Sequence, residues 1–187
     1  MDYRELRETG LRHLKEKLPS LNLQRHCFAV EAIMRELARH YGEDAELWGL
    51  AGLMHDVDYE EVKEDLARHS LIGSQWLAKW GFPGEVVKAV RVHNEAHGEL
   101  AQTRMEHALI FADAISGLIV SAALVVPSKK LADLKIESVL KRFKQKDFAK
   151  GVHREEILRC EKEGLSLEEF AGLSIKALQG VAPDLGL

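Results

Sequence analysis

Polar side chains stand on the apolar faces of five successive predicted helices. An amphipathic helix repeats its buried face at i, i+3, i+4 and i+7. On that spacing each helix places one metal-competent side chain inward, and a sixth follows directly: the residues are His26, His55, Asp56, His69, His93 and Asp113. Burying an isolated carboxylate is costly unless it is paired, and no lysine or arginine lies in phase to pair with these. A divalent cation would resolve this cost, because it neutralises carboxylates and binds neutral imidazole nitrogens.

The mixture of four histidines and two carboxylates indicates which cations are expected. Imidazole and carboxylate together suit Fe, Mn, Zn, Co or Ni better than Mg²⁺, which prefers oxygen ligands. Six ligands exceed one tetrahedral site and suit two metals that share a bridging carboxylate. Two metals about 3.5–4 Å apart clamp a phosphoryl group and hold a water that is deprotonated near neutral pH. We therefore expect a binuclear hydrolytic centre in which His55 and Asp56 are the central catalytic residues.

The elements that must position these residues are all predicted to be helices. Alternating β-branched runs, internal repeats and low-complexity linkers are absent. Glycine or proline ends most of the periodic segments. The predicted helices cover 3–17, 22–40, 44–55, 66–80, 84–93, 104–126, 153–163 and 167 onward. Ser166 and Glu169 have the spacing of a capping box for the last of them. The expected fold class is all-α.

The length and composition are those of one soluble globular domain. The chain has 187 residues, of which 46% are hydrophobic and 30% charged. A net charge of −4 argues against a dedicated nucleic-acid binder, which would usually be basic. Cys27 and Cys160 suggest no disulfide framework, and the charged N-terminus has no apolar leader segment. A cytoplasmic location is the expectation.

One stretch, Ala108–Val126, is long and apolar enough to suggest a membrane span. It contains Asp113, and a lone carboxylate costs about 2.5–3.5 kcal/mol at the centre of an inserted helix. Nothing else in the sequence is membrane-like. We expect a buried central helix and no membrane association.

His26, then His55-Asp56, then Asp113 resembles the H…HD…D signature of the HD-domain superfamily of metal-dependent phosphohydrolases. His69, in ARHSLIGSQWL, and His93, in KAVRVHNEAHG, resemble the extended pattern of its binuclear, HDIG-type branch. The resemblance covers about residues 22–126. It implies an all-α bundle of about five core helices, in agreement with the periodicity.

The resemblance also implies a ligand set. His26, His55, Asp56 and Asp113 match the residues that hold the first metal in the family. His69 and His93 match the pair that holds the second, with Asp56 as the bridge. The tetrad here is HDVD rather than HDIG, which puts the subgroup in doubt more than the metals. A GYP tripeptide is absent, which weakens an assignment as a cyclic-di-GMP phosphodiesterase.

Within a single domain of residues 1–187, we expect an HD metal-binding core over about 20–126 and a helical extension over about 127–187. The segment 129–150 holds eight Lys/Arg and three Asp/Glu. A solvated helix face explains this charge better than a binding patch.

Four further residues are candidates for contact with a substrate: Arg91, Asn94, His97 and Asp58. Oxyanions need cationic or donor groups near the metals, and Arg91 and Asn94 flank His93. A surface role is an alternative for both. Asp58 is either a turn residue or an outer partner that orients a metal ligand.

The expected function is metal-dependent hydrolysis of a phosphoester or phosphoanhydride in a nucleotide or related small molecule. Mononucleotides, dinucleoside polyphosphates and modified nucleotides stay open as substrates, and so does a homodimer. One alternative is a sensor module that binds metal and nucleotide without turnover. Another is a structural helical protein whose histidines merely pack.

Overall fold

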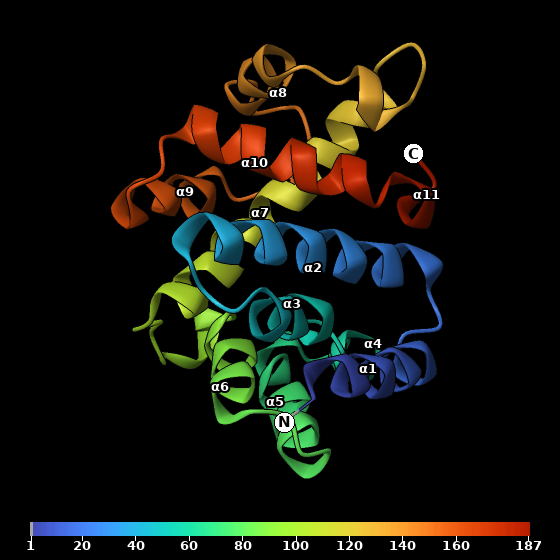
Figure 1. Ribbon diagram of the computed structural model, residues 1–187, viewed down its shortest axis with the longest axis vertical. Coiled ribbons are helices and arrows are strands. Elements are labelled where there is room, and N and C mark those ends of the chain that lie inside the picture. Colours follow the sequence, from blue (N-terminus) through green and yellow to red (C-terminus); the bar gives the residue numbers. More distant parts are fainter. Residues whose placement is uncertain (1) are drawn as a thin grey trace.

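The computed structural model describes residues 2–187, and over that range its regular elements are helices without strands (Figure 1). The all-α prediction is therefore confirmed. In chain order the α-helices are α1 (Tyr3–Lys17), α2 (Leu21–Tyr41), α3 (Ala45–Met54), α4 (Tyr59–Val62), α5 (Leu71–Lys79), α6 (Gly84–Val92), α7 (Arg104–Leu124), α8 (Ile136–Phe143), α9 (Arg154–Ile157), α10 (Leu167–Gly180) and α11 (Ala182–Leu185). Short 3₁₀ segments lie between them: η1 (Leu66–Arg68), η2 (Glu95–His97), η3 (Leu131–Asp133) and η4 (Leu158–Glu163).

Local signals explain where the long helices begin and end. The Asp44 side chain accepts hydrogen bonds from two backbone N–H groups in the first turn of α3. Gly42 ends α2 in the left-handed conformation, at φ 74°, which favours glycine because it has no Cβ. The predicted capping box at Ser166 and Glu169 is present at the start of α10.

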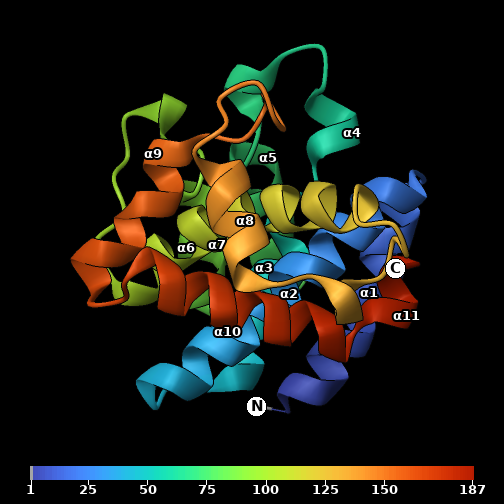
Figure 2. The same cartoon turned by 90° about the horizontal axis from the view of Figure 1, so that it is seen from above.

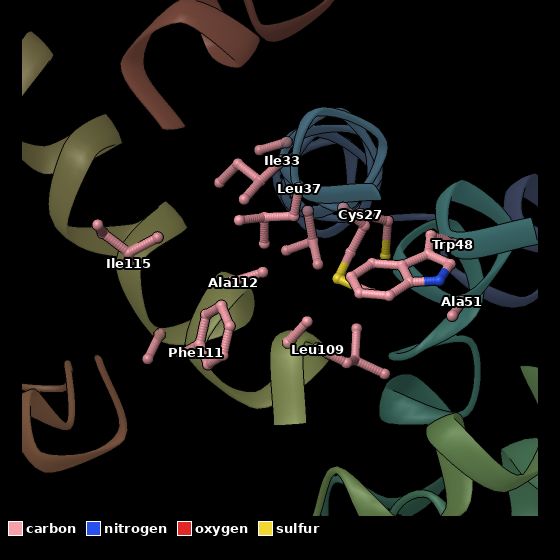
Figure 3. Close-up of a cluster of buried hydrophobic side chains, with 14 of the residues drawn as sticks. Cys27, Ile33, Leu37, Trp48, Ala51, Leu109, Phe111, Ala112 and Ile115 are labelled. Carbon is pink, nitrogen blue, oxygen red and sulfur yellow. The ribbon is translucent and has the colours of Figure 1, made fainter. Parts of the chain in front are cut away.

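Helices α2, α3 and α7 form the centre of the core (Figure 3). Every residue of α3 from Trp48 to Met54 is buried. This explains why the helix shows no amphipathic stripe: it is covered by α1, α2, α6 and α7. The histidine that ends α3 is consequently delivered into the interior of the protein.

The backbones of α2 and α3 come closest at Gly52. A Cβ at this position would lie 2.8 Å from both the N and Cα atoms of Glu31. Backbone atoms cannot rotate away as a flexible side chain can, so only glycine allows this approach. The Gly52 carbonyl also accepts a hydrogen bond from His55 Nδ1 at 2.8 Å.

We expect the Gly52→Ala variant to lower the free energy of unfolding by about 1–3 kcal/mol, the usual cost of overpacking a core. Chemical denaturation measures this change. Gly84→Ala is the matched control, because a Cβ at this exposed first residue of α6 meets nothing within 4 Å. Equal stability of the Gly52→Ala variant and the parent would show that α2 and α3 are not in backbone contact.

Helix α7 is long and apolar enough to cross a membrane by length and composition alone. In the structure it runs through the middle of the bundle, and 61% of its most apolar 18-residue window is buried (Figure 2). Such burial fits the central helix that the sequence predicts.

Two predicted helices differ from those observed. The segment 66–80 was expected to be continuous, but η1 ends at Arg68 and α5 begins at Leu71. Ser70 separates them in the left-handed region, at φ 68°, and its hydroxyl donates to the Arg91 carbonyl. Contacts with the following helix therefore override the local helical periodicity. The predicted helix 153–163 is α9 followed by the 3₁₀ segment η4.

The residues after α7 pack back onto the front half of the chain. Helix α10 lies against α2 and α7, and α9 and η4 lie against α7 (Figures 1 and 2). Phe170 of α10 meets Phe111 of α7 edge to face, with ring centroids 4.9 Å apart. In the basic segment 129–150, the α-helix is limited to α8, which buries Val139.

Candidate metal centre

Six side chains from five elements converge at one place beneath α2 and α7. His26 comes from the first half of α2, and Asp113 from the middle of α7. His55 and Asp56 follow the end of α3. His69 lies between η1 and α5, and His93 follows α6. The packing of these elements brings together residues that are as many as 87 positions apart in the sequence (113 − 26).

The first group of ligand atoms surrounds His26 Nε2. This atom lies 3.1 Å from His55 Nε2, 3.0 Å from Asp113 Oδ1 and 3.5 Å from Asp56 Oδ2. His55 Nε2 in turn lies 3.4 Å from Asp56 Oδ1. His26, His55 and Asp56 thus lie as ligands of one cation do, and Asp113 Oδ1 lies within 4 Å of Nε2 of both histidines.

The second group shares Asp56 with the first. Asp56 Oδ1 lies 3.2 Å from His69 Nε2 and 3.6 Å from His93 Nε2. Its Oδ2 faces His26 on the other side. A carboxylate placed between two sets of imidazoles has the geometry of a bridging ligand.

All four histidines present Nε2 to the cluster, because Nδ1 of each is already hydrogen-bonded. The acceptors are Gly52 O for His55, Val90 O for His93, Asp58 Oδ1 for His69 and Ser116 Oγ for His26. A neutral imidazole that donates from Nδ1 carries its free lone pair on Nε2. The donor set of lone pairs and carboxylates therefore fits a divalent transition metal.

The electrostatics of the cluster lead to the same conclusion. Burial raises the pKa of Asp56, but the neighbouring imidazoles, His55 foremost, outweigh it and hold that pKa well below its usual range. Burial lowers the pKa of His55 and His69, yet Asp56 outweighs it and, without a bound cation, their pKa values are about 9 and about 10. Protons bound to these two imidazoles then supply the positive charge that balances the carboxylates. A cation has to displace these protons, so metal affinity falls as the pH is lowered.

The cluster is open on one side only. The side chains of Asp113 and His26 are 35% and 26% exposed, whereas those of the other members are at most 12% exposed. Solvent and any ligand therefore reach the centre past Asp113 and His26.

The structure places Asp58 directly behind His69. Its side chain is fully buried; Oδ1 accepts from His69 Nδ1 at 2.8 Å and Oδ2 accepts from the Gly73 backbone N–H at 2.6 Å. A Cβ at residue 73 would lie 3.2 Å from Asp58 Oδ2, so glycine permits the close approach. Of the two interpretations from the sequence, this geometry suits the partner that orients a ligand, and it leaves Asp58 no surface for a substrate.

The other candidates for substrate contact have protein partners. Arg91 forms an ion pair with Glu99, with Nη2 2.5 Å from Oε1. Asn94 Nδ2 and His97 Nε2 both donate to the backbone carbonyl of His69, at 3.2 and 2.6 Å. Asn94 and His97 thus hold the main chain of His69 in place, and their role toward a substrate stays a prediction.

Two residues beside the cluster were missed from the sequence. Ser116 lies one helical turn after Asp113, where a hydroxyl in an apolar helix was the available signal; it accepts from His26 Nδ1 at 3.2 Å. Arg25 directly precedes His26 and is exposed. Nothing in the periodicity distinguished Arg25 from an ordinary surface arginine.

The C-terminal half of the chain supports the loop that holds His69. Arg159 of η4 makes a bidentate ion pair with Glu95, with N–O distances of 2.7 and 2.6 Å. Glu95 begins η2, and the Asn94 and His97 side chains at its two ends contact the His69 carbonyl.

We expect Arg159→Gln to lower the free energy of unfolding by about 1 kcal/mol, because the pair is well aligned and partly shielded from water. The charge-reversed double variant, Glu95→Arg with Arg159→Glu, should recover part of that loss in a double-mutant cycle. Lys150→Gln is the control, since its pair with Asp147 is exposed and should have no measurable effect. A zero coupling energy between residues 95 and 159 would contradict the expectation.

Comparison with known proteins locates the same region. Residues 23–118, just over half of the chain, match the HD domain. Ribonuclease Y of Fusobacterium nucleatum is 31% identical over 96 residues, 51% of this chain and 18% of that protein. Ribonuclease Y of Deinococcus radiodurans is 34% identical over 97 residues (52% and 17%), and that of Aquifex aeolicus 36% over 76 residues (41% and 14%).

The chain thus spans less than a fifth of the length of these curated relatives. The similarity concerns their HD region and does not extend to the rest of those proteins. The residue range that matches the HD domain contains all six members of the His/Asp cluster. On this match and this geometry, the chain belongs to the HD domain family, whose typical members are metal-dependent phosphohydrolases.

Proposed function

We propose that this protein is a binuclear metal-dependent phosphohydrolase that cleaves a phosphoester or phosphoanhydride of a nucleotide or a related small molecule. The observation that carries the proposal is the position of Asp56, whose carboxylate lies within 3.2–3.6 Å of Nε2 of all four histidines, with Oδ2 toward His26 and Oδ1 toward His55, His69 and His93. A carboxylate in contact with four imidazoles that all present Nε2 is placed as a ligand shared by two metals requires.

His26, His55, Asp56 and Asp113 would hold one cation, and His69, His93 and Asp56 a second. Fe, Mn, Zn, Co or Ni suits this donor set, and Mg²⁺ suits it less well. When bound, such a metal pair supplies a water that is deprotonated near neutral pH and positive charge for a phosphoryl group.

The protein's own groups would prepare the centre for that chemistry. The Nδ1 partners fix the orientation of each imidazole before any cation binds. The fully buried His55 and the nearly buried His93 close the back of the centre to water, which strengthens electrostatic interactions there. Asp113 and His26 leave the front open for the phosphate.

The relatives raise RNA as a second substrate class, because Ribonuclease Y is named for cleavage of RNA. Affinity for a polynucleotide depends on lysine and arginine side chains that neutralise several phosphates. This chain carries 26 Lys/Arg against 30 Asp/Glu, which favours a small phosphate compound over RNA.

Elemental analysis of the purified protein, followed by a screen of phosphoesters with added Mn²⁺, Fe²⁺ or Co²⁺, tests the proposal. We expect about two equivalents of transition metal, the stoichiometry of a shared-carboxylate centre, and hydrolysis of at least one nucleotide. Tight nucleotide binding without product over hours would instead identify a sensor module. Absence of metal, with no loss of stability on chelation, would identify a structural protein.

A further inference from the structure

A cavity of about 370 Å³ adjoins the open side of the metal centre. Its walls come from the first half of α2, the second half of α7 and the short helix α11, which lies beside α2 (Figure 1). His26 and Ser116 line this cavity and also belong to the metal centre or contact it. The cavity therefore adjoins the metal centre at His26, one of the two partly exposed members of the cluster.

The lining has two chemical parts. Ala29, Val120 and Leu185 form an apolar wall. Asn22 and Arg25 provide an amide and a guanidinium beside it. Small-molecule sites typically combine an apolar lining with a few polar groups, and 370 Å³ lies at the small end of their size range.

Arg25 is well placed to meet an anion. Arg25 is the arginine in the cavity lining, which it shares with His26. Its guanidinium rests over Gly186, where a Cβ would lie 2.8 Å from Nη2. Over residues 2–187 the structure gives this side chain no ion-pair partner, in contrast to Arg91 and Arg159. An unpaired guanidinium near a phosphate site favours binding of the phosphate oxygens.

We propose that this cavity binds the organic group of a phosphomonoester, of the size and polarity of a nucleoside, while Arg25 pairs with the phosphate at the metal centre. The assignment rests on the proposed function and extends it, since it names a 5′-nucleoside monophosphate as the substrate class. The base and sugar lie against Ala29, Val120 and Leu185. The amide of Asn22 can form hydrogen bonds with the polar edge of the base.

The shape of the cavity favours a monoester over RNA. Residues 185–187 line one side of it, and the lining offers one arginine. A single-stranded polynucleotide needs a basic groove that continues past the reacting phosphate, with platforms for successive bases. This cavity accommodates one organic group.

The decisive variant is Val120→Trp, which fills the cavity with an indole ring. The ligands are inorganic phosphate and the phosphonate analogue of adenosine 5′-monophosphate, which has carbon in place of the ester oxygen and cannot be hydrolysed. Their dissociation constants are measured by calorimetry on Mn²⁺-loaded protein. We expect the analogue to bind about tenfold or more weakly, the loss from roughly two unburied methylene equivalents, while phosphate binding stays unchanged.

Val87→Trp is the matched control. Val87 and Val120 are both half-buried valines packed against the core, but Val87 lies on α6 and outside the cavity. A second variant, Arg25→Gln, alters an exposed side chain and leaves the core intact. This variant should bind inorganic phosphate about fivefold more weakly, as expected for loss of a partly solvated ion pair. Arg39→Gln, on the same helix, should leave phosphate binding unchanged.

The outcomes separate this inference from the proposed function. Unchanged affinity of the Val120→Trp protein for the analogue overturns the cavity assignment, even if the parent hydrolyses phosphoesters. If the Val120→Trp change lowers the affinity for the analogue but the parent protein hydrolyses no phosphoester, the cavity assignment is supported and the proposed hydrolase activity is rejected. Tighter binding of an oligoribonucleotide than of the analogue, in competition with inorganic phosphate, overturns the monoester class in favour of RNA.

Discussion

Replacing Asp56 by asparagine is expected to abolish both transition-metal binding and phosphoester hydrolysis. Asp56 is the member of the cluster that faces both groups of imidazoles, with Oδ2 toward His26 and Oδ1 toward His69 and His93. An amide has no net charge and retains one acceptor oxygen, so it cannot bridge two cations. Metal centres contribute several kcal/mol to charge stabilisation, which corresponds to a loss of about 10³-fold or more in kcat.

Metal content by elemental analysis and kcat on the best phosphoester from the screen measure this effect together. Asp147→Asn is the control, because its carboxylate is 98% exposed in the segment before α9 and pairs only with Lys150. Circular dichroism verifies that both variants are folded. An Asp56→Asn protein that keeps two metals and normal turnover would remove the shared-carboxylate centre from consideration.

Replacing Asp58 by asparagine is expected to weaken the second metal site selectively. Both oxygens of Asp58 accept hydrogen bonds, from His69 Nδ1 and from the Gly73 N–H. Asparagine has one acceptor and one donor group, so one of these two N–H groups would face another donor. The His69 ring would lose its fixed orientation, and partners of this kind typically contribute 10–100-fold to metal affinity or activity.

Titration of metal-free protein with Mn²⁺ measures the two sites separately. We expect one of the two binding events to lose about 10–100-fold in affinity, with the other unchanged. Asp65→Asn, an exposed aspartate in the same segment, is the control. Equal loss at both sites, or at neither, would mean that Asp58 does not act through His69.

The sequence by itself was sufficient for the fold class and for the residues of the cluster. Helical periodicity is a local property: the phase of His26 on α2 or of Asp113 on α7 follows from apolar neighbours three and four positions away. Helix ends are also local, because a capping side chain such as Ser166 or a glycine such as Gly42 acts within its own turn. An inward phase therefore predicted that His26 and Asp113, which lie inside helices, and His55 and His93, which end them, point to one place.

Only the tertiary structure decided how these side chains are held. His69 was predicted to lie within a helix, yet it lies outside one, because the hydroxyl of Ser70 donates to the Arg91 carbonyl in the last turn of α6. Asn94 and His97 hydrogen-bond to the His69 carbonyl, a contact that the sequence did not indicate, and their role toward a substrate stays a prediction.

The same holds for the pairing of Glu95 with Arg159, 64 positions later, and for the cavity that brings Arg25 beside α11. Such contacts join segments far apart in the chain, and their geometry depends on the packing of every helix between them. Periodicity records which face of a helix is buried, but it carries no information about which distant group that face will meet.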